Sequence, residues 1–112
     1  MARYLISFDD GAMVIPEEEL PAVGEAAHRV VRAAQDAGVW VFGGGVERQR
    51  ATVVATDGTV ADGPFPETKA VIGGFAIVDV PSQEEALAWA TRFADACRCA
   101  QEVREIMADP LV

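Results

Sequence analysis

The sequence predicts an α+β sandwich, in which two helices lie on one face of an antiparallel sheet. Two stretches carry apolar residues at helical spacing, and short β-branched or aromatic runs stand between and around them. Turn-forming glycines and prolines separate most of these runs. The resulting order is strand, helix, strand, hairpin, long strand, helix and strand, which is typical of the ferredoxin-like fold. With 112 residues, of which 51% are hydrophobic, the chain (residues 1–112) is expected to form a single domain with its own core.

The first half of this pattern is a strand followed by an amphipathic helix. Residues 4–8 are apolar and aromatic, and the strand they predict stops at Asp9-Asp10-Gly11. Pro16 and the three acidic residues after it favour a helix start, and Pro21 offers a second position at which the helix proper begins. Apolar residues then recur at helical spacing: Leu20, Val23, Ala27, Val30, Val31 and Ala34. Gly38 is expected to end this helix as a C-cap.

The middle of the chain predicts a second strand and a hairpin. Residues 39–42 are strand-like and are closed by Gly43-Gly44-Gly45. A phosphate-binding loop would need a Lys and a Ser or Thr at a defined spacing, which are lacking here, so the glycines favour a bulge or turn with close backbone approach. Residues 51–56 and 59–61 flank Asp57-Gly58, a pair that predicts a type I′ hairpin turn.

The second half repeats the strand and helix pattern. Residues 71–80 are apolar at nearly every position, so we expect a central strand covered on both faces, with Gly73-Gly74 marking a bulge or a close approach. Ser82 and Glu85 have capping-box spacing and begin the second helix. Its apolar stripe consists of Ala86, Leu87, Ala90, Phe93, Ala94 and Cys97. Residues 101–107 predict the last strand.

Charge and cysteine usage limit the possible functions. The formal net charge of −9 argues against binding to nucleic acid or to an anionic membrane surface. Cys97 and Cys99 favour plain reduced thiols over a redox pair or a metal site, because no further ligand cluster accompanies them. No motif suggests a metal or an organic cofactor. No signal peptide or membrane span is recognisable, so a cytoplasmic location is expected.

A stiff, charged loop precedes the long strand. Its residues 62–69 read Asp-Gly-Pro-Phe-Pro-Glu-Thr-Lys, and Ile72-Gly73-Gly74-Phe75 follow closely. This segment resembles the signature of the YCII-related family, in the branch named for its Asp-Gly-Pro-Phe motif. Further similarity lies at residues 37–39, 77–80, 84–90 and 103–104. The resemblance therefore covers most of the chain.

The resemblance implies a ferredoxin-like fold of the dimeric α/β-barrel superfamily, in which the sheets of two copies pack face to face. It also implies a cleft beside the Asp-Gly-Pro-Phe loop, but it implies no particular reaction. Relatives in the wider superfamily include muconolactone isomerases, a chloromuconolactone dehalogenase and small monooxygenases. Members of this branch are often encoded beside, or fused to, sigma-factor-like proteins. Candidates to fill a homodimer interface are Phe42, Val54, Phe75 and Ile77.

Two residues are candidates for proton transfer. His28, on the first helix, is either an exposed or structural histidine or an acid/base group in a pocket. Asp62 is either a general base or ligand-orienting carboxylate, or the first residue of an Asx-type turn. The wider family is associated with a His–Asp pair, which would here be His28 and Asp95. Asp95 lacks the expected aromatic context, and Cys97-Arg98-Cys99 departs from the family's glycine-containing approach to the last strand.

The loop supplies the candidate ligand-binding residues Gly63, Pro64, Phe65, Glu67 and Lys69. Glu67 and Lys69 either pair on the surface or point into the cleft, where Lys69 would hold a substrate carboxylate. Phe65 either walls the cleft or fills the dimer core. The resulting hypothesis is a small dimeric enzyme-like domain that binds a polar or anionic organic molecule. The alternative is a non-catalytic regulatory or protein-interaction module, acting with a sigma-factor-like partner.

Overall fold

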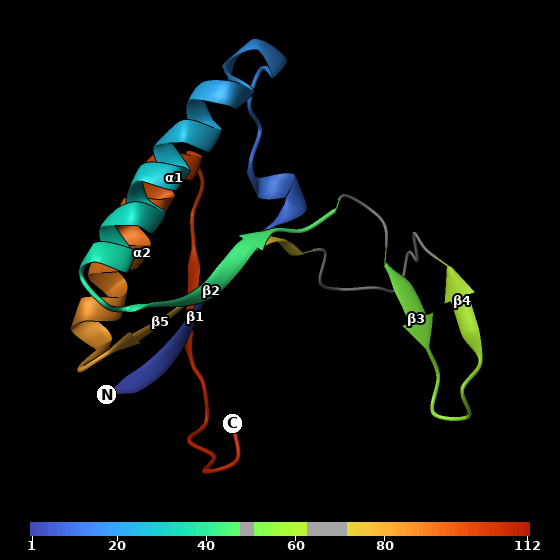
Figure 1. Cartoon of the computed structure of the whole chain (residues 1–112). Helices are drawn as coiled ribbons and strands as arrows, with labels where there is room; N and C mark the ends of the chain where they lie inside the picture. Colours follow the sequence, from blue (N-terminus) through green and yellow to red (C-terminus); the bar gives the residue numbers. More distant parts are fainter. Residues whose placement is uncertain (48–50, 63–71) are drawn as a thin grey trace.

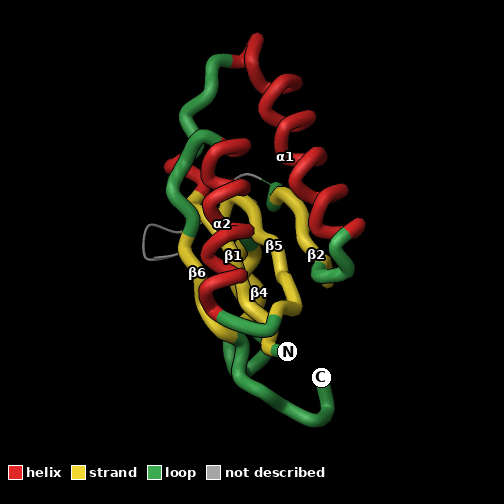
Figure 2. The backbone as a smooth tube through the Cα atoms, turned by 90° about the vertical axis from the view of Figure 1, so that its left-hand side faces the viewer, coloured by secondary structure: helices red, strands yellow, loops and turns green. Residues whose placement is uncertain are grey.

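The protein forms an α+β sandwich with a four-stranded antiparallel sheet and two helices on one of its faces (Figures 1 and 2). The computed structural model describes residues 1–47, 51–62 and 72–112. The elements of the sandwich are β1 (Ala2–Asp9), α1 (Leu20–Asp36), β2 (Trp40–Gly45), β5 (Ile72–Val80), α2 (Gln83–Cys97) and β6 (Glu102–Glu105). The strand order β2-β5-β1-β6 is that of a ferredoxin-like fold, which confirms the predicted fold class.

The first helix has the boundaries that its sequence predicts. Two short 3-10 turns precede it, at Asp10–Ala12 and Glu17–Glu19, and proline occupies its first turn. At its end Gly38 adopts a positive φ of 75° and donates to the carbonyl of Gln35 at 3.0 Å. Val39 donates to the carbonyl of Ala34 at 3.0 Å, which completes a Schellman motif.

The second helix also begins where expected. The Ser82 hydroxyl accepts a hydrogen bond from the Glu85 amide at 3.2 Å, which satisfies one free donor of the first turn. The helix ends at Arg98, a non-glycine residue with a left-handed φ of 57°. Two members of the predicted apolar stripes are exposed, Leu20 at 44% and Leu87 at 46%, and Ala27, Val31 and Ala94 are half-buried. No helix among the described residues is long and apolar enough to cross a membrane.

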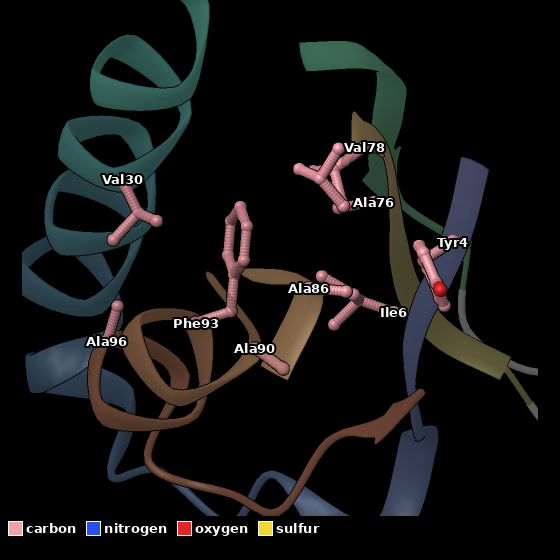
Figure 3. Close-up of a cluster of buried hydrophobic side chains, with 10 residues drawn as sticks. Tyr4, Ile6, Val30, Ala76, Val78, Ala86, Ala90, Phe93 and Ala96 are labelled. Atoms are coloured by element: carbon pink, nitrogen blue, oxygen red, sulfur yellow. The ribbon is translucent and has the colours of Figure 1, made fainter. Parts of the chain in front are cut away.

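The core lies between the helices and one face of the sheet. Register places Tyr4 beside Val78 and Ile6 beside Ala76, and all four side chains are buried. Phe93 reaches from α2 into the space between α1 and these strands (Figure 3). Small residues of both helices complete the cluster, among them Ala86, Ala90 and Ala96.

The opposite face of the sheet is open in the single chain. Side chains alternate along a strand, so Phe75 and Ile77 of β5 point away from the helices, and both are half-buried. Leu5 of β1 pairs with Ile77 on this face, and Phe42 of β2 contacts Phe75 with ring centroids 5.9 Å apart. The strand is central as predicted, and within the single chain the helices cover one of its two faces.

The glycine-rich segments permit close packing. All three glycines of residues 43–45 belong to β2, and the bulge lies earlier, between Trp40 and Phe42. A β-carbon at Gly43 would overlap the backbone of Phe75, and one at Gly74 would lie 2.9 Å from the Phe8 ring. The predicted close approaches at both glycine clusters are confirmed. The cluster at residues 43–45, however, continues β2 instead of ending it.

The hairpin consists of β3 (Thr52–Val54) and β4 (Val60–Asp62) and stands apart from the four-stranded sheet (Figure 1). Gly58 donates to the carbonyl of Ala55 at 2.9 Å and has a φ of 88°. Asp57 has no positive φ, so the predicted type I′ turn is wrong. The chain instead forms a four-residue turn from Ala55 to Gly58, and the Asp57 carboxylate accepts from the Thr59 amide at 2.9 Å.

Candidate functional site

A cavity of about 590 Å³ lies between α1, the end of α2 and the β2 side of the sheet. The sheet contributes Ile6, Phe8, Trp40, Phe42, Gly43, Gly44, Gly45, Gly73, Gly74, Phe75 and Ala76. The helices and connecting segments contribute Met13, Leu20, Val23, Gly24, Ala27, His28, Val31, Gln35, Phe93, Cys97 and Gln101. The same layers that form the core therefore leave a hollow toward the edge strand.

Missing side chains explain why this hollow forms. Gly45 on β2 and Gly74 on β5 pair with each other, on the face that the helices cover. On the facing side of α1, Gly24 has no side chain and Ala27 has only a methyl group. The rings of Trp40 and Phe93, 6.4 Å apart between centroids, lie against the cavity where the compact core begins.

Among the residues that the structure describes, the polar side chains His28, Gln35, Cys97 and Gln101 line the cavity. His28 is exposed and Gln101 is half-buried, and the Gln101 amide donates to the carbonyl of Cys99 at 3.3 Å. Burial raises the pKa of the Cys97 thiol above its usual range, and the charge of Cys99 adds to this. A thiol that stays protonated is a weak nucleophile, so proton transfer at His28 suits this cavity better than covalent catalysis.

A second hollow, a groove of about 770 Å³, runs between the outer sides of α1 and α2. Arg29, Arg92, Arg98 and Asp95 line it. Arg98 forms an exposed ion pair with Glu19 at 2.6 Å. The described residues of the cavity include none of these charged side chains.

Two of the predicted site residues can be located. His28 lies at the cavity, whereas Asp62 ends β4 with its backbone paired to Thr52. The side chain of Asp62 lies outside the described part of the structure, as do Gly63, Pro64, Phe65, Glu67 and Lys69. Asp95 lines the groove, so the two residues suggested for the family's His–Asp pair do not line one hollow.

A model of the YCII-related domain matches residues 2–108 of this chain. The chain belongs to the YCII-related family. Among curated proteins, none matches its sequence. The fold is similar to that of 5-chloro-2-hydroxyhydroquinone dehydrochlorinase from Burkholderia phenoliruptrix, solved with 2,5-dihydroxybenzoquinone. That similarity covers 96% of this chain and 95% of the other, with a TM-score of 0.49 and 17% sequence identity.

Sequence reasoning missed two cavity residues of this YCII-related chain, Gln35 and Gln101. Gln35 follows His28 by seven positions, two helical turns further along the same side of α1. Extending the stripe from Ala27 and Val31 past its last apolar member would have found it. Gln101 lies in the short connection to β6 and gives no such periodic signal.

Arg104 of this YCII-related chain lies on β6 and forms an ion pair with Glu102. The structure pairs the two side chains at 2.5 Å, and both are exposed. This pair lies on the open face of the sheet, because Arg104 is in register with Leu5. Arg104 is therefore no part of the cavity.

Proposed function

We propose that the protein is a small enzyme-like domain that binds a small organic molecule in the cavity and moves a proton through His28. One observation carries this proposal: the single histidine of the chain lines a hollow of ligand size. Small-molecule sites are typically mostly apolar clefts of about 300–1,000 Å³ with a few polar groups. An imidazole can donate or accept a proton near neutral pH, which makes it suited to general acid/base work.

The Asp-Gly-Pro-Phe loop is proposed to form the mouth of this site. It connects β4 to β5, and β5 carries Gly73 and Gly74 at the cavity wall. A loop that leads directly into two wall residues can bring Asp62 and Lys69 to the same opening. Asp62 would act as the second proton-transfer group. Gly63, Pro64, Phe65 and Glu67 would contact the bound molecule, and Lys69 would hold any negative charge on it.

We further propose that the protein is a homodimer, formed through the open face of the sheet. Phe42 is 62% exposed there, and its ring contacts Phe75 instead of the core. Leu5 and Ile77 extend the same apolar surface. Exposed apolar patches of this kind mark interaction surfaces, and a second copy offers an equal patch.

A second candidate function is a regulatory module that acts with a sigma-factor-like protein. Val53, Val54 and Val60 favour it, because they are exposed on a hairpin that does not pair with the four-stranded sheet. An isolated two-stranded hairpin is marginally stable in water, so its apolar side chains suit a binding surface.

The enzyme-like proposal can be tested by a fragment screen that is read out on His28. Because this is the sole histidine, its imidazole signals in nuclear magnetic resonance are unambiguous. Small ring compounds and small acids should include binders that shift these signals and the amides of Gly43 to Gly45. His28→Gln should keep the binding of the same fragments, because the amide preserves hydrogen bonding. Fragments that bind without moving either set of signals, or a screen with no binders, would contradict the proposal.

A further inference from the structure

The chemistry of the cavity wall restricts the ligand further than the proposed function does. Charged residues make up 24% of the sequence, and the groove on the other side of the helices has three arginines and one aspartate. Among the cavity residues that the structure describes, His28, Gln35, Gln101 and Cys97 are the polar groups, and none is a Lys, Arg, Asp or Glu. The two hollows are thus suited to different ligands.

A carboxylate fits this wall poorly. Transfer of an ionised group into a mostly apolar site is costly unless a charged or strongly hydrogen-bonding partner compensates it. Transfer of a hydroxyl group into the same site costs less and is compensated by ordinary hydrogen bonds. The hydroxyl can donate to a neutral imidazole or to an amide oxygen, and it can accept from an amide N–H, and the cavity offers all of these groups at His28, Gln35 and Gln101.

The shape of the wall favours a flat apolar body on the ligand. Phe8, Trp40 and Phe93 present aromatic rings to the cavity, and rings pack well against other rings in offset or edge-to-face contact. Gly45 and Gly74 expose bare backbone between these rings. A β-carbon at Gly45 would have no heavy atom within 4 Å, so the space above it is open.

We infer that the cavity takes an uncharged, planar ring compound that carries a hydroxyl group, such as a phenol or an enol, in preference to a carboxylate. This inference rests on the proposed function and names its substrate class. The hydroxyl proton is then the proton that His28 accepts, and the apolar wall holds the ring. It narrows the expectation of a polar or anionic molecule to the polar, uncharged case.

The test compares two probes of the same ring size, 2-naphthol and 2-naphthoate, by isothermal titration calorimetry at pH 8. On the full chain, naphthol should bind with a dissociation constant about tenfold or more below that of naphthoate. Gly45→Leu should weaken naphthol binding about tenfold or more, because its side chain enters the open space above the strand.

Gly11→Leu is the matched control, since an added β-carbon there also has no heavy atom within 4 Å, and Gly11 is exposed and does not line the cavity. It should leave naphthol binding unchanged. If Gly45→Leu does not fold, Ala27→Phe blocks the same cavity from the side of α1. Equal binding by a folded blocking variant would overturn the assignment of the site.

The remaining outcomes separate this inference from the function on which it rests. If naphthoate binds as well as naphthol or better, the ligand class is wrong while the cavity remains a binding site. Loss of that naphthoate binding in Lys69→Gln would then identify the loop as the source of the positive charge. If neither probe binds, both the inference and the proposed function of this cavity are overturned.

Discussion

The two faces of the four-stranded sheet differ in cover, although the same strands build both. On the helix side, Ala76, Val78 and Val80 of β5 are buried. On the other side, Phe75 and Ile77 of the same strand are only half-buried. The bulkier apolar side chains of this strand therefore point to the face without helices.

This difference shows that apolar content does not identify the covered face. Two helices of about four turns each can cover one side of a small sheet, and this side then needs small residues so that the layers pack closely. The other face keeps its large apolar residues for a surface that this chain does not itself provide.

The largest effect is expected for truncation on the covered face. Ile6 is 1% exposed and lies in the core cluster, so Ile6→Ala should lower the free energy of unfolding by about 2–5 kcal/mol. Leu5→Ala, one position along β1 and on the open face, is the matched control and should cost clearly less. Urea denaturation at low protein concentration measures both values. Equal losses would mean that the open face is packed as well as the core.

The next effect concerns association through the open face. Phe42→Asp places a charge on that apolar surface, beside Phe75, and it should weaken dimer formation about thirtyfold or more. Leu87→Asp is the control, because Leu87 is also exposed but lies on α2. Sedimentation equilibrium gives both dissociation constants. A wild-type protein that sediments as a stable monomer at micromolar concentration would refute the paired-sheet arrangement itself.

A pH-dependent effect is expected at the margin of the covered face. Burial, and then the hydrogen bond and charge of Glu105, raise the pKa of Tyr4 above its usual value. Because the folded-state pKa is raised, its contribution to stability is complete below about pH 10 and is lost as the pH rises through the folded-state pKa. Tyr4→Phe should therefore lose less stability in alkaline solution than the wild type does.

Denaturation curves at a series of alkaline pH values provide this measurement. Burial also raises the pKa values of Cys97 and Cys99. The wild type and the Tyr4→Phe variant should therefore both lose some stability in alkaline solution. Tyr4 is the single tyrosine, which allows its ionisation to be followed directly by tyrosinate absorbance. Ionisation at the value of a free tyrosine would contradict the role of burial.

The fold was predictable because most of its signals are local. The capping spacing of Ser82 and Glu85 and the C-cap at Gly38 each act within a few residues, and both were found where expected. The failures depend on contacts between distant segments. The exposure of Leu87 and the open face of β5 follow from how the layers pack, which periodicity does not encode.

The candidate site was predictable only in part for the same reason. His28 was recognised by its residue type. Its place at a cavity depends on the missing side chains of Gly45 and Gly74, which lie on two strands that come together only in the fold. Gln101 lies far from His28 in the sequence and enters the site through topology. The roles of Asp62 and the loop after it remain predictions.

The smallest effect is expected for the ion pair on the open face. A guanidinium nitrogen of Arg104 lies only 2.5 Å from a carboxylate oxygen of Glu102, yet the two side chains are 60% and 51% exposed. Water screens such a pair, so Arg104→Ala should change the free energy of unfolding of the monomer by about 0–1 kcal/mol. High salt should remove what remains of this difference. Removing one partner of a buried ion pair is costly. If Arg104→Ala lowers the free energy of unfolding by several kcal/mol, and only at concentrations where the protein associates, the pair is instead buried between two copies.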